Sequence, residues 1–92
     1  MRMKPPPQIE LGAKAVGARI AACRRANRWT QLDLAKRTGI YPSTVGIIEV
    51  GLRLPTFRQA IVLAVVFRRS LKWLLFGAPR NMKLWRAVEQ QS

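Results

Sequence analysis

The stretch from Thr30 to Gly51 contains start and stop signals for two short helices that follow each other closely. Thr30 is a favourable N-cap residue, and the acid three positions later completes a capping-box pattern. Gly39 suits the left-handed conformation that ends many helices. Pro42 is tolerated at the first position of the next helix. The sequence therefore predicts two helices joined by a tight turn, the second of them over residues 42–50.

Apolar residues recur at spacings of three and four on both sides of this pair, which predicts further helices. The first is expected over residues 10–26, with Cys23 as a small core residue. Thr56 and Ser70 are N-cap candidates for a fourth helix and a short fifth one. The residues expected to face the core are Val16, Ile20, Cys23, Val45, Ile48, Phe57, Ala60, Ile61, Ala64, Leu71, Leu74 and Leu75.

At 92 residues the chain has room for one small domain, which we place at residues 9–77. No strand-like alternation is present, so the expected fold class is all-α. Residues 1–8 are basic and contain three consecutive prolines, and we expect them to form a flexible arm. Residues 78–92 form a C-terminal tail, and the sequence leaves open whether a sixth helix forms there.

Positive charge dominates the composition. Seventeen lysines and arginines face four acids, for a net charge of +13. Such a field attracts polyanions, either nucleic acid or an anionic membrane surface. The 49% hydrophobic content suffices for a folded core and argues against a disordered polycation.

Several site types are excluded by what the chain lacks. Histidine is absent and Cys23 is the single cysteine, so the sequence offers no internal disulfide, no Cys/His metal site and no His-containing catalytic set. A glycine-rich phosphate loop is also absent. We expect no enzyme activity, metal or cofactor. The N-terminus lacks the apolar segment of a signal peptide, and the apolar run 60–67 is too short to span a bilayer, so a cytoplasmic protein is expected.

With these residues the chain resembles the Cro-like phage-repressor (xenobiotic-response-element type) helix-turn-helix family. The matching positions lie within residues 16–77: Ile20, Arg24, the run 30–35, Gly39, Ile40, the runs 43–45 and 49–51, Pro55, Ala64 and the run 74–77. The resemblance implies a five-helix Cro/repressor-like DNA-binding domain and a prophage-like regulator that acts as a homodimer. In such a domain the second helix of the pair lies in the major groove.

The resemblance also implies roles for individual residues. The expected base contacts are Tyr41, Pro42, Ser43, Gly46 and Ile47. The expected phosphate contacts are Arg28, Gln31, Thr44, Arg53 and Arg58. Arg24 and Glu49 correspond to an ion pair that ties the first helix to the third. The expected dimer interface, around the fifth helix, comprises Trp73, Phe76 and Trp85.

The sequence departs from the family pattern in two places. Bases are usually read by long polar side chains, but the expected reading surface is small and apolar apart from Ser43. This predicts weak or shape-driven readout, with a different use of the surface as the alternative. Arg68 and Arg69 stand where the family has a helix-ending glycine and a buried aliphatic residue, and this predicts a longer fourth helix.

The function expected from these features is sequence-specific binding of double-stranded DNA by a nucleoid-associated transcription regulator, with repression as the expected outcome. An alternative class is a protein-interaction module on the same scaffold, such as an antitoxin with a toxin partner. A membrane-active cationic protein is the third class. The capping signals and the Arg24–Glu49 pairing favour a folded, DNA-binding domain over that third class.

Overall fold

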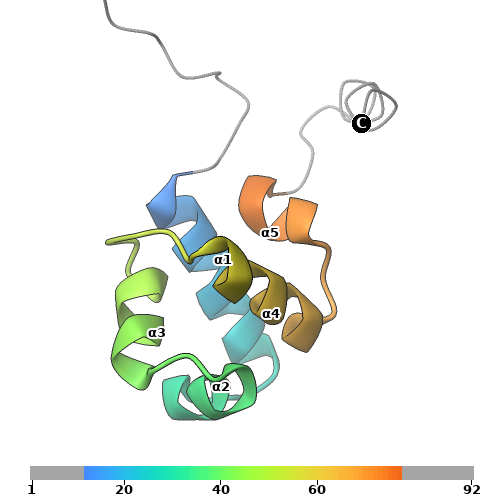
Figure 1. Cartoon of the computed structure of the whole chain (residues 1–92). Helices are drawn as coiled ribbons and strands as arrows, with labels where there is room; N and C mark the ends of the chain where they lie inside the picture. The colour runs from blue at the N-terminus through green and yellow to red at the C-terminus, as the bar shows by residue number, and fades with distance from the viewer. Residues whose placement is uncertain (1–11, 78–92) are drawn as a thin grey trace, which may run out of the picture.

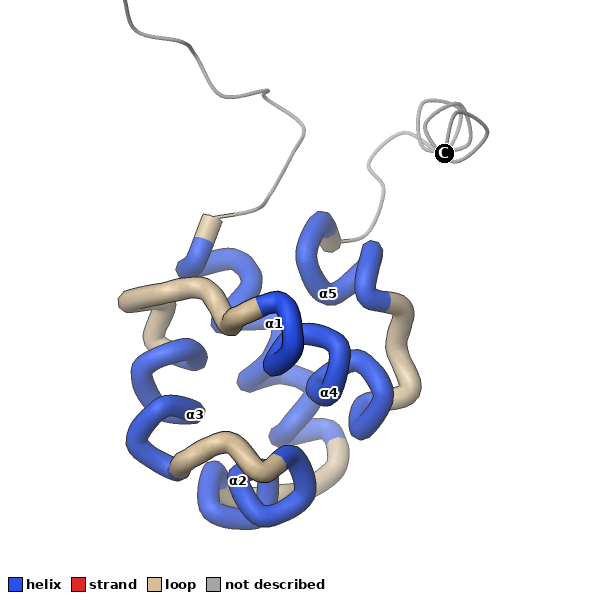
Figure 2. Tube along the Cα trace, in the orientation of Figure 1, coloured by secondary structure: helices blue, strands red, loops and turns tan. Residues whose placement is uncertain are grey.

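The structure is a computed structural model that describes residues 12–77. This part of the chain folds into five helices and contains no strand, which confirms the all-α prediction (Figures 1 and 2). The helices are α1 (Ala13–Ala26), α2 (Gln31–Thr38), α3 (Pro42–Glu49), α4 (Phe57–Phe67) and α5 (Leu71–Phe76). The predicted arm 1–8, the tail 78–92 with its sixth helix, and the predicted helix start at residue 10 lie outside the described residues.

Three helices begin at hydroxyl side chains that accept a hydrogen bond from a backbone N–H in the first turn. Thr30 and Asp33 form a reciprocal capping box at α2, with N–H to side-chain oxygen distances of 3.0 and 2.8 Å. Thr56 and its partner Gln59 repeat the arrangement at α4. Ser70 accepts from the third residue of α5 at 3.0 Å. Each cap satisfies N–H groups that the helix itself leaves without partners.

The core lies around α1, which packs against α3, α4 and α5 (Figure 1). Its largest fully buried side chains are Ile20, Leu34, Ile48, Leu63, Leu74, Val16 and Val45. Trp29 covers one edge of this core, where its ring stacks on Phe67 with 6.1 Å between ring centroids. Burial of this kind of side chain stabilises a fold by about 1.5–3 kcal/mol each.

Arg19 joins α1 to the end of α5. Its Nε and Nη2 donate hydrogen bonds of 2.9 Å to the carbonyl oxygens of Leu74 and Leu75. These carbonyls belong to the last turn of α5, where the helix provides no N–H partner. The cation also complements the negative end of the helix dipole. α5 is therefore held to the domain by polar contacts as well as by buried Leu74.

Two residues expected in the core point outward instead. Phe57 is 71% exposed and Ile61 is 40% exposed, whereas Ala60, Leu63, Ala64 and Phe67 form the buried side of α4. The prediction is therefore confirmed for Ala60 and Ala64 and wrong for Phe57 and Ile61, because the buried face is rotated about the helix axis from the expected one. Cys23 lies only at the edge of the core, and burial raises the pKa of its thiol.

The expected lengthening of the fourth helix is also wrong. α4 ends at Phe67, and Arg68 adopts the left-handed conformation with φ 55° and ψ 40°. The Arg69 N–H then donates to the Ala64 carbonyl at 3.0 Å, which closes the helix end. Arg68 thus takes the backbone conformation that glycine adopts at most such sites. No helix within residues 12–77 has the length and apolar character needed to cross a membrane.

Candidate nucleic-acid interface

The turn between α2 and α3 is fixed by local hydrogen bonds and one buried side chain. Gly39 is left-handed, with φ 74°, and its N–H donates to the Ala35 carbonyl at 2.8 Å. The Thr38 hydroxyl donates to the Leu34 carbonyl at 2.7 Å and accepts from the Ile40 N–H at 3.3 Å. Ile40 is buried and anchors the turn in the core. The angle between α2 and α3 is therefore determined by backbone geometry and packing together.

The exposed side of α3 collects most of the expected base contacts. Tyr41 is the N-cap of α3 and is 78% exposed, followed by exposed Pro42 and Ser43. Ile47, one turn further along, is 39% exposed. The opposite side of α3 is formed by Val45 and Ile48, both fully buried. α3 thus presents a surface of small and apolar side chains to the solvent.

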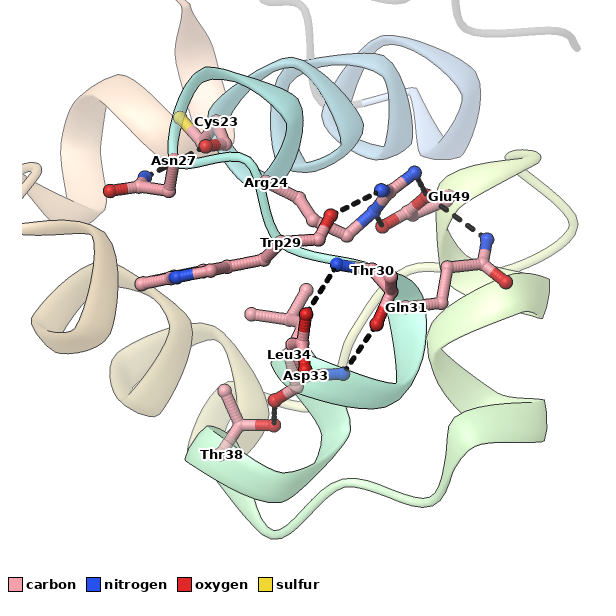
Figure 3. Close-up of polar contacts among 10 residues, drawn as sticks. All are labelled: Cys23, Arg24, Asn27, Trp29, Thr30, Gln31, Asp33, Leu34, Thr38 and Glu49. Carbon is pink, nitrogen blue, oxygen red and sulfur yellow. Dashed lines mark hydrogen bonds and ion pairs between the residues drawn. The ribbon is translucent and has the colours of Figure 1, made fainter.

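Arg24 and Glu49 form a bidentate ion pair between α1 and the end of α3 (Figure 3). The Arg24 Nε and Nη2 donate to the two carboxylate oxygens at 2.7 and 3.0 Å. The side chains are only 12% and 4% exposed. The hydrogen bond to Glu49 raises the pKa of Arg24, so the guanidinium stays charged. Arg24 Nη1 also donates to the Trp29 carbonyl at 2.8 Å, just before α2. One guanidinium therefore joins α1, α2 and α3.

Gln31 extends this network at the start of α2. Its Nε2 donates to Glu49 Oε1 at 3.1 Å (Figure 3). Gln31 is exposed, as a phosphate contact requires, but one of its two amide N–H groups is directed to the carboxylate of α3. The side chain thus links the first residue of α2 to the last residue of α3.

The remaining expected phosphate contacts lie around the same two helices. Arg28 precedes α2 in a left-handed conformation with φ 59° and is exposed. Arg53 is exposed in the loop after α3, and Arg58 is exposed in the first turn of α4. Thr44, in α3, is half-buried. The three arginines are therefore exposed cations that lie just before α2, in the loop after α3 and in the first turn of α4.

A helix-turn-helix family model matches residues 20–74, which include every element of this arrangement from the middle of α1 to α5. The chain belongs to the Cro-like helix-turn-helix family. Comparisons with curated proteins and with solved structures gave no match. The family is one of DNA-binding regulators.

The described helix-turn-helix domain carries a large excess of positive over negative side chains. Residues 12–77 contain twelve lysines and arginines and two acids, Asp33 and Glu49. Both acids are engaged within the domain, Glu49 with Arg24 and Asp33 with the Thr30 cap. The described residues therefore present a large excess of cations over carboxylates, a pattern that favours a polyanionic ligand.

Asp33 gives the helix-turn-helix domain a specific pH dependence. The hydrogen bond from the Thr30 N–H, followed by the one with the Thr30 side chain, lowers the pKa of Asp33. A carboxyl group whose pKa is lower in the folded state stabilises that state above its unfolded pKa of about 3.9 and loses this contribution as pH falls. We expect the melting temperature of the wild type to fall more steeply below about pH 5 than that of Asp33→Asn. Identical slopes in thermal melts from pH 7 to pH 2.5 would contradict the capping role.

Gly46 lies in the middle of α3, where glycine weakens a helix. A Cβ atom at this position would meet only Gln31 Oε1, at 3.8 Å, which is ordinary contact. We therefore expect Gly46→Ala to raise the free energy of unfolding by up to about 1 kcal/mol. Urea unfolding of the wild type and the variant measures this directly. A loss of stability would show that α3 is more tightly packed against α2 than the structure indicates.

The expected dimer residues lie apart from this surface. Trp73 is half-buried, and the Arg69 guanidinium lies 3.7 Å from the centre of its ring. Phe76 is also half-buried. Trp85 lies outside the described residues. Part of the surface of Trp73 and of Phe76 is therefore already buried within the domain.

Two glycines position α3, and sequence reasoning singled out Gly51 of these but not Gly17. A Cβ on Gly17 of α1 would lie 2.2 Å from the Ile48 carbonyl oxygen and 2.8 Å from that of Glu49. Gly51 ends the turn after α3 with φ 83°, and a Cβ there would lie 2.6 Å from the Lys14 Cα. The signal available for Gly17 was a glycine inside a helical pattern, which often marks a close backbone approach.

Proposed function

We propose that this protein is a transcriptional repressor that binds double-stranded DNA with α3 in the major groove. The observation that carries the proposal is the exposed side of α3, held in place by the Gly39 turn and the Arg24–Glu49 pair. Helix-turn-helix proteins dock in this way, with the first helix of the pair crossing the phosphate backbone. The excess of cations around α2 and α3 supports the same ligand.

In the proposed complex, base readout is limited to a few contacts. Ser43 donates to or accepts from a base edge, and Ile47 packs on thymine methyl groups. Tyr41 and Pro42 shape the surface at the N-terminus of α3, and Gly46 allows close approach of the helix backbone. Such contacts discriminate bases less strongly than bidentate arginine or glutamine contacts, which contribute about 1–3 kcal/mol each. Preference then depends partly on DNA shape.

Affinity in the proposed complex comes mainly from phosphate contacts. Arg28, Gln31, Thr44, Arg53 and Arg58 supply them from the residues that surround α3. Contacts of this kind position a protein on DNA without reading sequence. They also release bound counterions, so affinity falls as salt rises.

Arg53 allows a direct test of this assignment. We expect Arg53→Ala to weaken binding to all duplexes alike and to reduce the slope of log K against log salt by about 1. Arg69→Ala is the charge-matched control, because Arg69 lies between α4 and α5 and stacks on Trp73. Titration of a labelled duplex at several salt concentrations measures both variants. Equal losses for the two variants would mean that net charge, not the α3 surface, determines binding.

The wild type provides the test of the function itself. The protein is expected to bind labelled duplex at low salt and to bind more weakly at high salt. Absence of binding at low salt would exclude a DNA-binding role. A second protein that co-purifies with the chain, combined with absence of DNA binding, would favour the antitoxin alternative. We further propose that the repressor acts as a homodimer in the cytoplasm, associated with the nucleoid.

A further inference from the structure

A cleft of about 570 Å³ lies at the C-terminal ends of α1, α2 and α4. Asn27 and Trp29 line it from the junction between α1 and α2, Arg37 lines it from the last turn of α2, and residues 65–68 line it from the end of α4. In Figure 3, Asn27 and Trp29 extend to the same side of the junction. We call this hollow the Trp29 cleft.

The Trp29 cleft is separate from the proposed DNA contacts. None of the residues that line it is an expected base or phosphate contact. α2 packs against both α3 and α4, and in Figure 1 it lies between α3 and the C-terminal end of α4. Because residues of α2 and α4 line the cleft, it opens on the α4 side of α2.

Two arginines give the Trp29 cleft a positive charge, and none of its lining residues is acidic. The Arg37 guanidinium lies 4.3 Å from the centre of the Trp29 ring. An arginine stacked on an aromatic ring keeps its N–H edges available for a carboxylate or phosphate. Arg68 is exposed, and neither guanidinium donates a hydrogen bond within residues 12–77. Asp33, one turn before Arg37 on α2, is already bonded to the Thr30 cap.

Most of the remaining lining of the Trp29 cleft is apolar. Phe67 is buried and stacks on Trp29, with 6.1 Å between ring centroids. Val65 and Val66 add aliphatic surface beside them. Ligand pockets of about 300–1,000 Å³ usually have such an apolar lining, with a few polar groups that orient the ligand. The cleft therefore suits a small molecule that combines an apolar body with an anionic group, more than it suits a bare phosphate backbone.

Arg68 lines the Trp29 cleft in a backbone conformation that costs free energy. Its φ of 55° is left-handed, and only glycine takes this conformation without a steric penalty. Within residues 12–77 the other non-glycine residue with positive φ is Arg28, between Asn27 and Trp29, with its side chain outside the lining. Strained residues of this kind cluster at ligand sites. Both of them therefore flank the same cleft.

We propose that the Trp29 cleft binds a small organic anion. The apolar body of the ligand packs on Trp29 and the end of α4, and its carboxylate, sulfonate or phosphate group is bound by Arg37 and Arg68. At position 68 glycine would end α4 at lower cost but would supply no charge to the cleft. This inference goes beyond the proposed function and does not depend on it, because the cleft and the α3 surface share no residue.

The first test is a fluorescence titration of the full chain with anilinonaphthalene sulfonate, an aromatic anion whose emission rises in apolar sites. The wild type is expected to bind the dye saturably. Arg68→Gly is expected to weaken this binding about tenfold, because one charge-assisted contact is lost. Arg53→Ala removes the same charge from the loop after α3 and should leave dye binding unchanged. Equal losses in the two variants would mean that net charge determines dye binding, and the proposal would fail.

Arg68→Gly also separates loss of binding from loss of folding. Glycine takes the left-handed conformation freely, so this variant should melt at a temperature no lower than that of the wild type. Arg37→Gln is the second variant, since Arg37 has an ordinary helical backbone within α2, and it should weaken dye binding as well. If either variant folds and binds the dye as tightly as the wild type does, the proposal is wrong.

Two further probes test the class of ligand. Phenylnaphthylamine has the rings of the dye without the sulfonate, and inorganic phosphate has negative charge without rings. Each is expected to bind at least about tenfold more weakly than the dye, because each offers the cleft only one of the two groups. Equal affinity for phenylnaphthylamine would overturn the requirement for an anion, and equal affinity for phosphate would overturn the requirement for an apolar body.

The indole N–H signals of the tryptophans locate the bound dye. In heteronuclear NMR spectra recorded during the titration, the Trp29 signal is expected to shift and the Trp73 signal to stay in place. Trp73 is a matched control, because the Arg69 guanidinium lies 3.7 Å from the centre of its ring on α5. Equal shifts would show that the dye binds any exposed pair of arginine and tryptophan, and this result would overturn the assignment to the cleft.

Discussion

Glu49→Ala is expected to lower the free energy of unfolding by about 3–5 kcal/mol, because it leaves the Arg24 guanidinium buried without its counter-charge. The Glu49 side chain is 4% exposed and accepts hydrogen bonds from both Arg24 and Gln31. Small domains have only about 5–15 kcal/mol of stability in total, so a loss of this size removes a large fraction of it. The variant should therefore unfold at a markedly lower urea concentration and temperature than the wild type.

Urea unfolding followed by circular dichroism measures this loss. Arg25→Ala is the matched control, because Arg25 is an exposed arginine next to Arg24 on α1, and its replacement should change stability by less than about 0.5 kcal/mol. Arg24→Met combined with Glu49→Met should cost less than the sum of the two single replacements, since neither charge is then left alone. A loss below about 1 kcal/mol in Glu49→Ala would place the pair among ordinary exposed ion pairs.

Gly17→Ala is expected to destabilise the domain by about 3 kcal/mol, at the upper end of the range for overpacked sites. The added Cβ would lie 2.2 Å from the Ile48 carbonyl oxygen and 2.8 Å from that of Glu49. These atoms are backbone, so they move only if α1 and α3 separate. Separation would also strain the Arg24–Glu49 pair. The intrinsic helix preference for alanine, about 1 kcal/mol, is too small to compensate.

Gly46→Ala is the matched control for this prediction, because it makes the same chemical change in a helix where the Cβ has room. The two variants should therefore shift the midpoint of urea unfolding in opposite directions. If Gly17→Ala is as stable as the wild type, the close approach of α1 and α3 at this position is incorrect. DNA binding by Gly17→Ala should weaken only as far as the folded fraction falls.

The helix pair and its turn could be predicted because their signals are local. The Thr30 cap, Gly39 and Pro42 each act through the backbone within a few residues, and the structure shows a helix start, a left-handed turn and a first helical residue at these positions. The contact between Arg24 and Glu49 was suggested only by the family resemblance. Their separation of 25 residues leaves no local signal for it.

The orientation of α4 could not be read from its sequence. Apart from Arg58 and Gln59 the helix is entirely apolar, so Phe57, Ala60, Ile61 and Ala64 fit a helical spacing as well as Ala60, Leu63, Ala64 and Phe67 do. Packing against α1, α2 and α5 selects the second set. The first set then leaves two large residues, Phe57 and Ile61, on the surface.

The end of α4 was mispredicted for a different reason. A left-handed residue costs an L-amino acid free energy, so a sequence without glycine at that point favours a continuing helix. In the structure the chain must turn there to bring α5 against α1, and Arg68 accepts the unfavourable conformation. Arg28 does the same before α2. Tertiary contacts outweigh the local preference at both positions.

The central claim, that the exposed side of α3 contacts bases in the major groove, is tested most directly by selecting bound sequences from a random duplex pool. We predict that the wild type enriches a two-fold symmetric sequence whose half-sites are about one turn of DNA, 34 Å, apart. Ile47→Ala should change the enriched bases at one position in each half-site, whereas Leu32→Ala should not. Enrichment of no sequence, or of the same sequence by wild type and Ile47→Ala, would contradict the claim.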